Sequence, residues 1–113
     1  MKYDLEERTA LFAVNILKLC NKVNKTLIAT PIIDQLIKSG TSIGANYMEA
    51  CGASSKKDFK NKVYICKKES METKYWLRML SQTSPEFIKD CRILWKEVQE
   101  LTLIFSTITK NTK

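Results

Sequence analysis

The residues best placed for acid–base chemistry are two glutamates, Glu69 and Glu72, three residues apart and close to Tyr75 and Trp76. This spacing puts both carboxylates on one side of a helix. Such a pair can act as general acid and base beside a nucleophile or a metal ion, but nothing nearby in the sequence supplies either. A second interpretation is that the glutamates form ion pairs with neighbouring basic side chains. A third places the patch at a subunit interface, where aromatic residues concentrate.

The usual catalytic and metal-binding residues are scarce. The chain has no histidine, the commonest general base and metal ligand. Its four cysteines are well separated, and zinc binding would require all of them to converge: Cys20, Cys51, Cys66 and Cys91. We therefore expect free thiols that behave as small hydrophobic residues, with no metal ion, no cofactor and no enzymatic activity. An enzyme would have to rely on the carboxylates near the motifs, which are Glu49, Glu69 and Glu72.

Positive charge is concentrated in one segment. The net charge is +7, and residues 53–78 hold eight basic and three acidic side chains, against eleven and nine in the rest of the chain. Five lysines of this segment form the predicted nucleic-acid surface: Lys56, Lys57, Lys60, Lys67 and Lys74. Lysine contacts with phosphate groups would tolerate any base sequence. The alternative is a solvated face that only keeps the protein soluble.

A stretch rich in small residues, SGTSIGANYMEA at 39–50, keeps a helical apolar spacing although it holds two of the three glycines. A glycine inside a helix costs about 1 kcal/mol, so we expect close packing in return. This favours a continuous helix over one broken by a Gly-Ser loop. The predicted surface for helix packing or oligomer contact comprises Gly40, Ile43, Gly44, Tyr47, Glu49, Glu69, Glu72, Tyr75 and Trp76.

These residues are placed by four apolar heptad patterns, which predict helices at about 4–23, 31–51, 56–81 and 85–109. Asp4, Thr30-Pro31, Ser55 and Ser84-Pro85 are typical helix starts, and Gly52 is a typical stop. The connections are short, so the sequence predicts one all-α domain over residues 1–113, an antiparallel up-down-up-down four-helix bundle.

No membrane contact is expected. No stretch approaches about 18 uninterrupted apolar residues, and the start, MKYDLEER, is followed by no apolar region of the kind found in signal peptides. These observations predict a cytoplasmic protein.

Two motifs resemble those of a bacterial family of four-helix bundles, the 23S rRNA intervening-sequence proteins. The first family motif, a basic residue and then SG-SI-AN--EA, is matched by Lys38, Ser39, Gly40, Ser42, Ile43, Ala45, Asn46, Glu49 and Ala50. The second, SKKDF and then KE-A-ET-YWL, is matched by Ser55, Lys56, Lys57, Asp58, Phe59, Lys68, Glu69, Glu72, Thr73, Tyr75, Trp76 and Leu77. Ser70 departs from the pattern, because alanine is common there.

The resemblance implies an antiparallel bundle that assembles as a cyclic homopentamer. It also points to the accessory variability proteins of diversity-generating retroelements, which use a basic pentameric barrel to bind nucleic acid and a reverse transcriptase. The family has no catalytic residues to carry over.

Composition and resemblance together predict a non-catalytic, basic homo-oligomer that engages RNA, DNA or a nucleoprotein partner. The alternative is a structural or scaffold homo-oligomer with no nucleic-acid role. Salt-dependent binding to nucleic acid separates these two hypotheses, because only the first predicts it.

Overall fold

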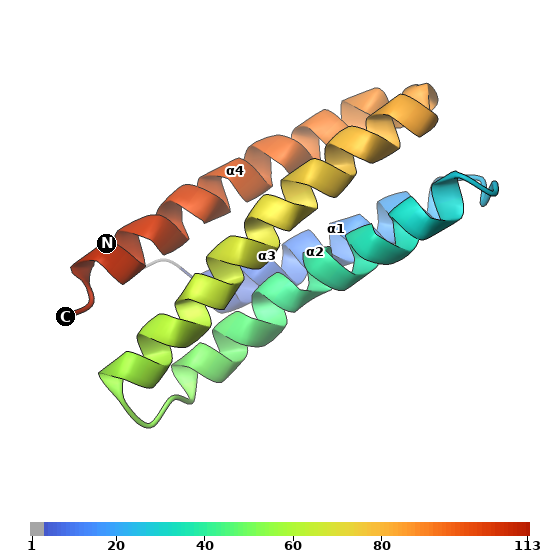
Figure 1. The fold of residues 1–113 in the computed structure, drawn as a ribbon. Helices are drawn as coiled ribbons and strands as arrows, with labels where there is room; N and C mark the ends of the chain where they lie inside the picture. The colour runs from blue at the N-terminus through green and yellow to red at the C-terminus, as the bar shows by residue number, and fades with distance from the viewer. Residues whose placement is uncertain (1–3) are drawn as a thin grey trace.

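Four long helices make up the computed structural model, which describes residues 4–113. They are α1 (Leu5–Lys22), α2 (Ala29–Cys51), α3 (Lys56–Thr83) and α4 (Ile88–Asn111), with a short 3-10 turn, η1 (Pro85–Phe87), before α4. Figure 1 shows two helical hairpins, α1–α2 and α3–α4, lying side by side as an antiparallel bundle. The predicted fold class is confirmed; residues 1–3 of the predicted domain lie outside the described part of the chain.

The two hairpins meet mainly along α2 and α3, whereas α1 and α4 touch little. The α1–α4 side is bridged by Arg8, whose Nε donates to Glu97 Oε2 at 2.7 Å and whose Nη2 donates to Glu97 Oε1 at 2.8 Å. The same Nη2 donates to Glu100 Oε1 at 2.9 Å. The hydrogen bonds to Glu97 raise the pKa of Arg8 above its ordinary value. A charged fork thus joins two helices whose backbones come close at few points.

Two of the predicted helix starts have the expected side-chain cap. Asp4 accepts from the Glu7 amide at 3.2 Å, and Ser55 accepts from the Asp58 amide at 3.0 Å. Each hydroxyl or carboxylate satisfies an amide that has no partner inside the helix. At the other end of α2, Gly52 is the C-cap, as predicted.

α2 begins at Ala29, two residues before the predicted start after Thr30, and the predicted cap at Thr30 is wrong. Thr26 Oγ1 accepts from the Ala29 amide at 3.0 Å, and the Thr30 amide donates to the Thr26 carbonyl at 3.0 Å. Thr26 therefore offers the capping hydroxyl one turn earlier, and Thr30 lies inside the helix. Pro31 remains in the first turn of α2, where a missing amide is tolerated.

The predicted start of the fourth helix at Ser84-Pro85 also differs. The chain first forms η1, in which the Phe87 amide donates to the Ser84 carbonyl at 3.0 Å, and the Ser84 side chain caps nothing. α4 begins only at Ile88. A tight turn at this point reverses the chain within a few residues, which brings the end of α3 against the start of α4.

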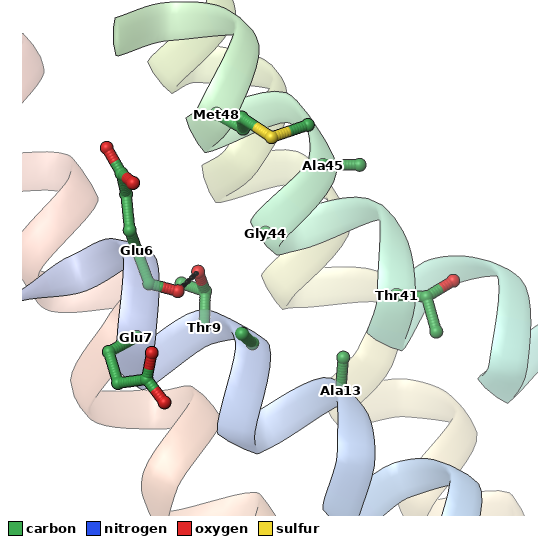
Figure 2. Close-up of a pocket in the computed structure, with 9 residues that line it drawn as sticks. Glu6, Glu7, Thr9, Ala13, Thr41, Gly44, Ala45 and Met48 are labelled. Carbon is green, nitrogen blue, oxygen red and sulfur yellow. Dashed lines mark hydrogen bonds between the residues drawn. The ribbon is translucent and has the colours of Figure 1, made fainter.

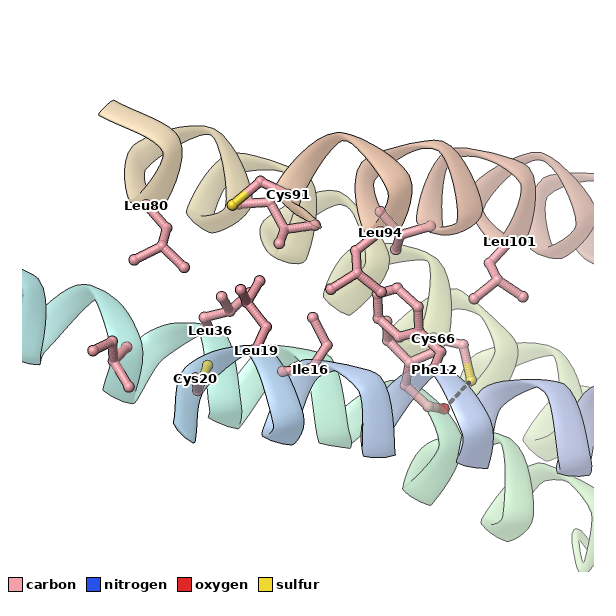
Figure 3. Close-up of a cluster of buried hydrophobic side chains, with 14 of the residues drawn as sticks. Phe12, Ile16, Leu19, Cys20, Leu36, Cys66, Leu80, Cys91, Leu94 and Leu101 are labelled. Atoms are coloured by element: carbon pink, nitrogen blue, oxygen red, sulfur yellow. Dashed lines mark hydrogen bonds between the residues drawn. The ribbon is translucent and has the colours of Figure 1, made fainter. Parts of the chain in front are cut away.

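The core consists of the heptad positions that the sequence predicts. Figure 3 shows side chains from all four helices pointing into the space between them, among them Phe12, Leu36, Cys66 and Leu101. These side chains are nearly inaccessible to solvent. Phe59 and Phe87, which begin the predicted stripes of the last two helices, are only partly buried at its edge.

The small-residue stretch is a continuous helix, as predicted. A Cβ atom on Gly40 would lie 3.0 Å from Ile16 Cγ1, and one on Gly44 would lie 3.0 Å from Thr9 Oγ1. Both distances are too short for a side chain without movement of α1. The close approach at both glycines is therefore to α1 of the same chain.

Candidate nucleic-acid interface

Basic residues of α3 face two different directions. Lys56 and Lys57 are exposed at its start, whereas Lys60, Lys67 and Lys74 recur every seven residues and are half-buried. Lys74 donates to Gln99 Oε1 on α4 at 2.6 Å, and its ammonium lies over the Trp95 ring, 5.6 Å from the centroid. The seven-residue spacing places Lys60 and Lys67 on the same side of α3, toward α4.

Most of the exposed residues of α3 form a second heptad row, opposite the core, and exposed Lys56, Glu72 and Thr83 lie outside this row. We call this the outer stripe; it consists of Lys57, Asn61, Tyr64, Lys68, Met71, Tyr75, Arg78 and Gln82. Tyr64 and Tyr75 are 49% and 54% exposed. No acidic residue occupies a stripe position. Tyr64 and Met71 were not among the predicted site residues. The sequence could have indicated both, because they lie on the side of the helix opposite the buried heptad positions.

One groove lies between α3 and α4, near η1. Its volume is about 230 Å³, and it is lined by Leu77, Arg78, Ser81, Gln82, Ile88, Cys91, Arg92 and Trp95. We call it the Arg78–Arg92 groove. It opens where the outer stripe ends, because Arg78 and Gln82 belong to both. No local sequence signal indicates this groove, since its two arginines come from different helices.

The three candidate glutamates occupy separate environments. Glu49 pairs with Lys62 across the α2–α3 seam at 3.0 Å. Glu69 lies 3.9 Å from Lys68, and its side chain is 18% exposed. Burial, and secondarily the charge of Glu72, raises the pKa of Glu69 above its ordinary value. Among residues 4–113 no group of three or more Asp, Glu, Cys or His side chains is arranged to hold a metal ion.

The aromatic candidates divide between core and surface. Tyr47 packs against Phe105 with ring centroids 6.1 Å apart, and burial raises its pKa to about 12. Trp76 is partly buried against the core. The Tyr75 ring lies edge-on to the Trp76 ring, with the ring centroids 4.9 Å apart. Ile43 is fully buried. Of the predicted packing or oligomer residues, Glu72 and Tyr75 are therefore the ones left exposed on α3.

The thiols are poor nucleophiles. Cys20, Cys66 and Cys91 are buried, and burial raises their pKa to about 11, 12 and 11. A thiol that stays protonated at neutral pH is a weak nucleophile, because the thiolate is the reactive form. Cys51 is exposed, and its pKa is also raised, first by partial burial.

The outer face of the α1–α2 hairpin carries two further grooves. One, of about 330 Å³, lies beside the glycine contact, and Figure 2 shows it between Ala13 of α1 and Ala45 of α2, with Glu6 and Glu7 toward one end. The other, of about 490 Å³, has apolar walls that include Val14, Leu17 and Ile37. Small side chains on both helices, among them Ala13, Gly44 and Ala45, leave the first of these hollows.

Comparison with known proteins supports the fold and the motifs. The family model described as 23S rRNA-intervening sequence protein matches residues 1–107. A solved structure from Bacteroides thetaiotaomicron, described as a protein with unknown function from the S23 ribosomal protein family, is 33% identical and has a TM-score of 0.83. The alignment covers 94% of this chain and 98% of that one. No curated protein matches the chain significantly.

No helix within residues 4–113 is long and apolar enough to cross a membrane. The family match spans nearly the whole sequence, including both motifs, all of α1, α2 and α3, and most of α4. The chain therefore belongs to the family of 23S rRNA-intervening sequence proteins.

Proposed function

We propose that this protein is a non-catalytic, basic homo-oligomer that binds nucleic acid through α3. The observation that carries the proposal is the outer stripe, where Lys57, Lys68 and Arg78 are exposed together with two tyrosines; one exposed acidic residue, Glu72, lies beside it. Basic side chains interleaved with aromatic ones suit a polyanion whose bases also offer flat faces.

Binding of this kind draws its free energy from counterion release. Each phosphate neutralised by a lysine or arginine frees a condensed cation, so affinity falls steeply as salt rises. The net charge of +7 adds long-range attraction. Only three arginines are present, and arginine is the commonest reader of guanine edges. The proposed binding is therefore tolerant of base sequence.

The proposal includes self-association into a ring, a homopentamer by family resemblance. Exposed Val14, Leu17 and Met48 on the α1–α2 face give such a ring apolar surface to bury. Repeating the outer stripe around a ring would multiply its weak contacts into tight binding. The free cysteines support the reducing cytoplasm as its location.

The experiment is a salt titration of binding. Fluorescence anisotropy of labelled RNA and DNA, single-stranded and duplex, measures affinity from about 50 to 200 mM salt, where such contacts weaken strongly. We expect binding at the low end and a linear fall of log affinity with log salt. Absence of binding to every probe at about 50 mM salt would contradict the proposal.

A scaffold role without nucleic acid is the second candidate, and the groove beside Gly44 favours it because Glu6 and Glu7 line that groove and repel phosphate. In that case the protein forms the same oligomer, and its lysines only solubilise it. Light scattering that gives an oligomer, together with no binding in the salt titration, would select this role.

A further inference from the structure

The Arg78–Arg92 groove gathers residue types that recognise a nucleotide. Two of the three arginines and one of the two tryptophans of the chain line it. Arg78 comes from α3, whereas Arg92 and Trp95 lie three residues apart on one side of α4. The floor is apolar and includes Leu77 and Ile88. Two planar cations and a flat aromatic ring thus line one groove together with apolar side chains.

The charge of this groove is not neutralised by the protein. None of its lining residues is acidic. Within residues 4–113, the ion pairs within 4.0 Å involve Arg8, Lys22, Lys62 and Lys68, and neither Arg78 nor Arg92. A guanidinium without a carboxylate partner keeps its fork of donors for an external anion, and phosphate oxygens match that fork in geometry.

Lys74 contacts the Trp95 ring from α3. It lies over Trp95, 5.6 Å from the ring centroid, while its ammonium also donates to Gln99. Trp95 remains 39% exposed toward the groove. The ring is therefore positioned before any ligand arrives, which lowers the entropy lost on stacking. At about 230 Å³, the groove suits one planar ring rather than a larger organic molecule.

We propose that the Arg78–Arg92 groove binds one unpaired nucleotide of a single-stranded nucleic acid. Its base stacks on Trp95, and Arg78 and Arg92 hold the adjacent phosphates. This inference rests on the proposed function and narrows it, because the bases of a duplex are already stacked and cannot enter without unpairing. The protein accordingly prefers single strands to duplexes of the same length.

Gln82 and Ser81 complete the site. The Ser81 hydroxyl donates to the Arg78 carbonyl at 2.7 Å, and the Gln82 amide is exposed at the rim. An amide can both donate to and accept from a base edge, so Gln82 contacts any of the four bases. An acidic peptide would pair with the arginines but offers no flat ring to Trp95, so the aromatic residue favours nucleic acid.

Tryptophan fluorescence tests the stacking directly. The Trp76→Phe variant leaves Trp95 as the single tryptophan. Titration with single-stranded oligothymidylate should quench its emission to saturation, and the matching duplex should quench it far less. The Trp95→Phe variant leaves Trp76, which packs on the core, and its emission should stay constant. If Trp76→Phe does not fold, subtracting the Trp95→Phe signal from that of the wild type gives the same quantity.

Affinity measurements test the arginines. Arg78→Gln with Arg92→Gln should weaken binding of single strands at least tenfold and abolish the preference over duplex. The matched control is Lys89→Gln with Lys96→Gln, which removes the same charge from exposed positions of α4 outside the groove. This control should lower the affinity for single strands and for duplexes by the same factor. That factor should be smaller than the one for the arginine variant.

Five results would overturn the inference. If the wild type binds nucleic acid without quenching of Trp95, the proposed function remains supported but the groove is not the binding site. If the arginine and lysine variants lower the affinity for single strands equally, the groove contributes only non-specific positive charge. Quenching by oligoglutamate as strong as that by oligothymidylate assigns the groove to an acidic protein partner. A changed oligomer mass in the arginine variant makes the groove a subunit contact. No binding of any nucleic acid at low salt removes the proposed function as well.

Discussion

Lys74 and Trp95 form a cation–π contact across the α3–α4 seam, with the ammonium 5.6 Å from the ring centroid. The same ammonium donates to Gln99, so this lysine is already committed to the fold. Among the five lysines predicted to contact nucleic acid, Lys74 therefore already has partners on α4, whereas Lys56 and Lys57 are exposed at the start of α3.

The protein should self-associate into a ring, which we expect to hold five chains. Exposed apolar side chains on the α1–α2 face provide the surface that such a contact buries. Light scattering at micromolar concentration measures the mass directly. A particle of 13.0 kDa, the mass of one chain, would rule the ring out.

Gly44→Leu should destabilise the bundle by several kcal/mol, since overpacking a close contact costs about 1–3 kcal/mol or more. The first added carbon would already lie 3.0 Å from Thr9 Oγ1. Gly52→Leu is the matched control, because a Cβ there meets nothing closer than 3.7 Å. Thermal unfolding followed by circular dichroism compares the two. Equal melting temperatures for Gly44→Leu and the wild type would show that α1 and α2 separate freely at this point.

Glutamine in place of four α3 lysines should weaken binding to all nucleic-acid sequences about equally. The variant combines Lys56→Gln, Lys57→Gln, Lys60→Gln and Lys67→Gln, none of which is buried in the core. The slope of log affinity against log salt should become shallower by about 0.7 for each phosphate no longer neutralised on a single strand, or about 0.9 on a duplex. Circular dichroism should be unchanged.

The control for this lysine variant removes charge from the other hairpin, at Lys18, Lys22 and Lys25. It should retain most of the affinity. Should the α3 variant bind as tightly as the wild type while the α1 control loses affinity, the binding surface lies on the α1–α2 hairpin instead.

Arg8→Met should lower the free energy of unfolding by about 1 kcal/mol, because it removes a two-pronged contact at a partly exposed site. Glu97 and Glu100 would also be left facing each other. Urea unfolding measures the change. Lys22→Met serves as the reference, since its pair with Asp90 spans 4.0 Å and both partners are exposed, so its stability should not change.

Stability should fall as pH rises above about 9. Burial raises the pKa of Cys66 from 9.0 to about 12 and that of Cys20 to about 11. In the unfolded chain these thiols release protons at lower pH than in the fold, so rising pH favours unfolding. The stabilisation is complete below pH 9 and is lost as pH rises toward 12. Urea unfolding at about pH 8 and about pH 10 measures the difference. Equal stability at both values would mean that the thiols are hydrated in the fold.

The fold could be predicted because its signals are local and periodic. Heptads from Phe59 to Leu80 and from Cys91 to Phe105 fix which side of α3 and α4 is buried. Helix starts were harder, because several hydroxyls compete for the same role. At α2 the sequence offers both Thr26 and Thr30, and only the observed hydrogen bond to the Ala29 amide decides between them.

The candidate site could be predicted only in part. The charge of α3 is plain in the sequence, but the pairing of Arg78 with Arg92 depends on how two helices align across a tight turn. The contact of Lys74 with Gln99 could not be predicted for the same reason, because Gln99 lies on α4. The sequence predicts close packing at Gly44 from the small-residue face. It does not indicate that the partner is α1 of the same chain.

The scarcity of contact between α1 and α4 has a kinetic consequence. Each helix packs mainly on the next one along the chain, through short connections. Contacts between consecutive segments require little loop-closure entropy before they form, and bundles of this kind fold in microseconds to milliseconds. The α2–α3 pair can form first, and each outer helix then adds to an existing neighbour. The Arg8 fork joins α1 to Glu97, 89 residues further along the chain, so we expect it to close late in folding.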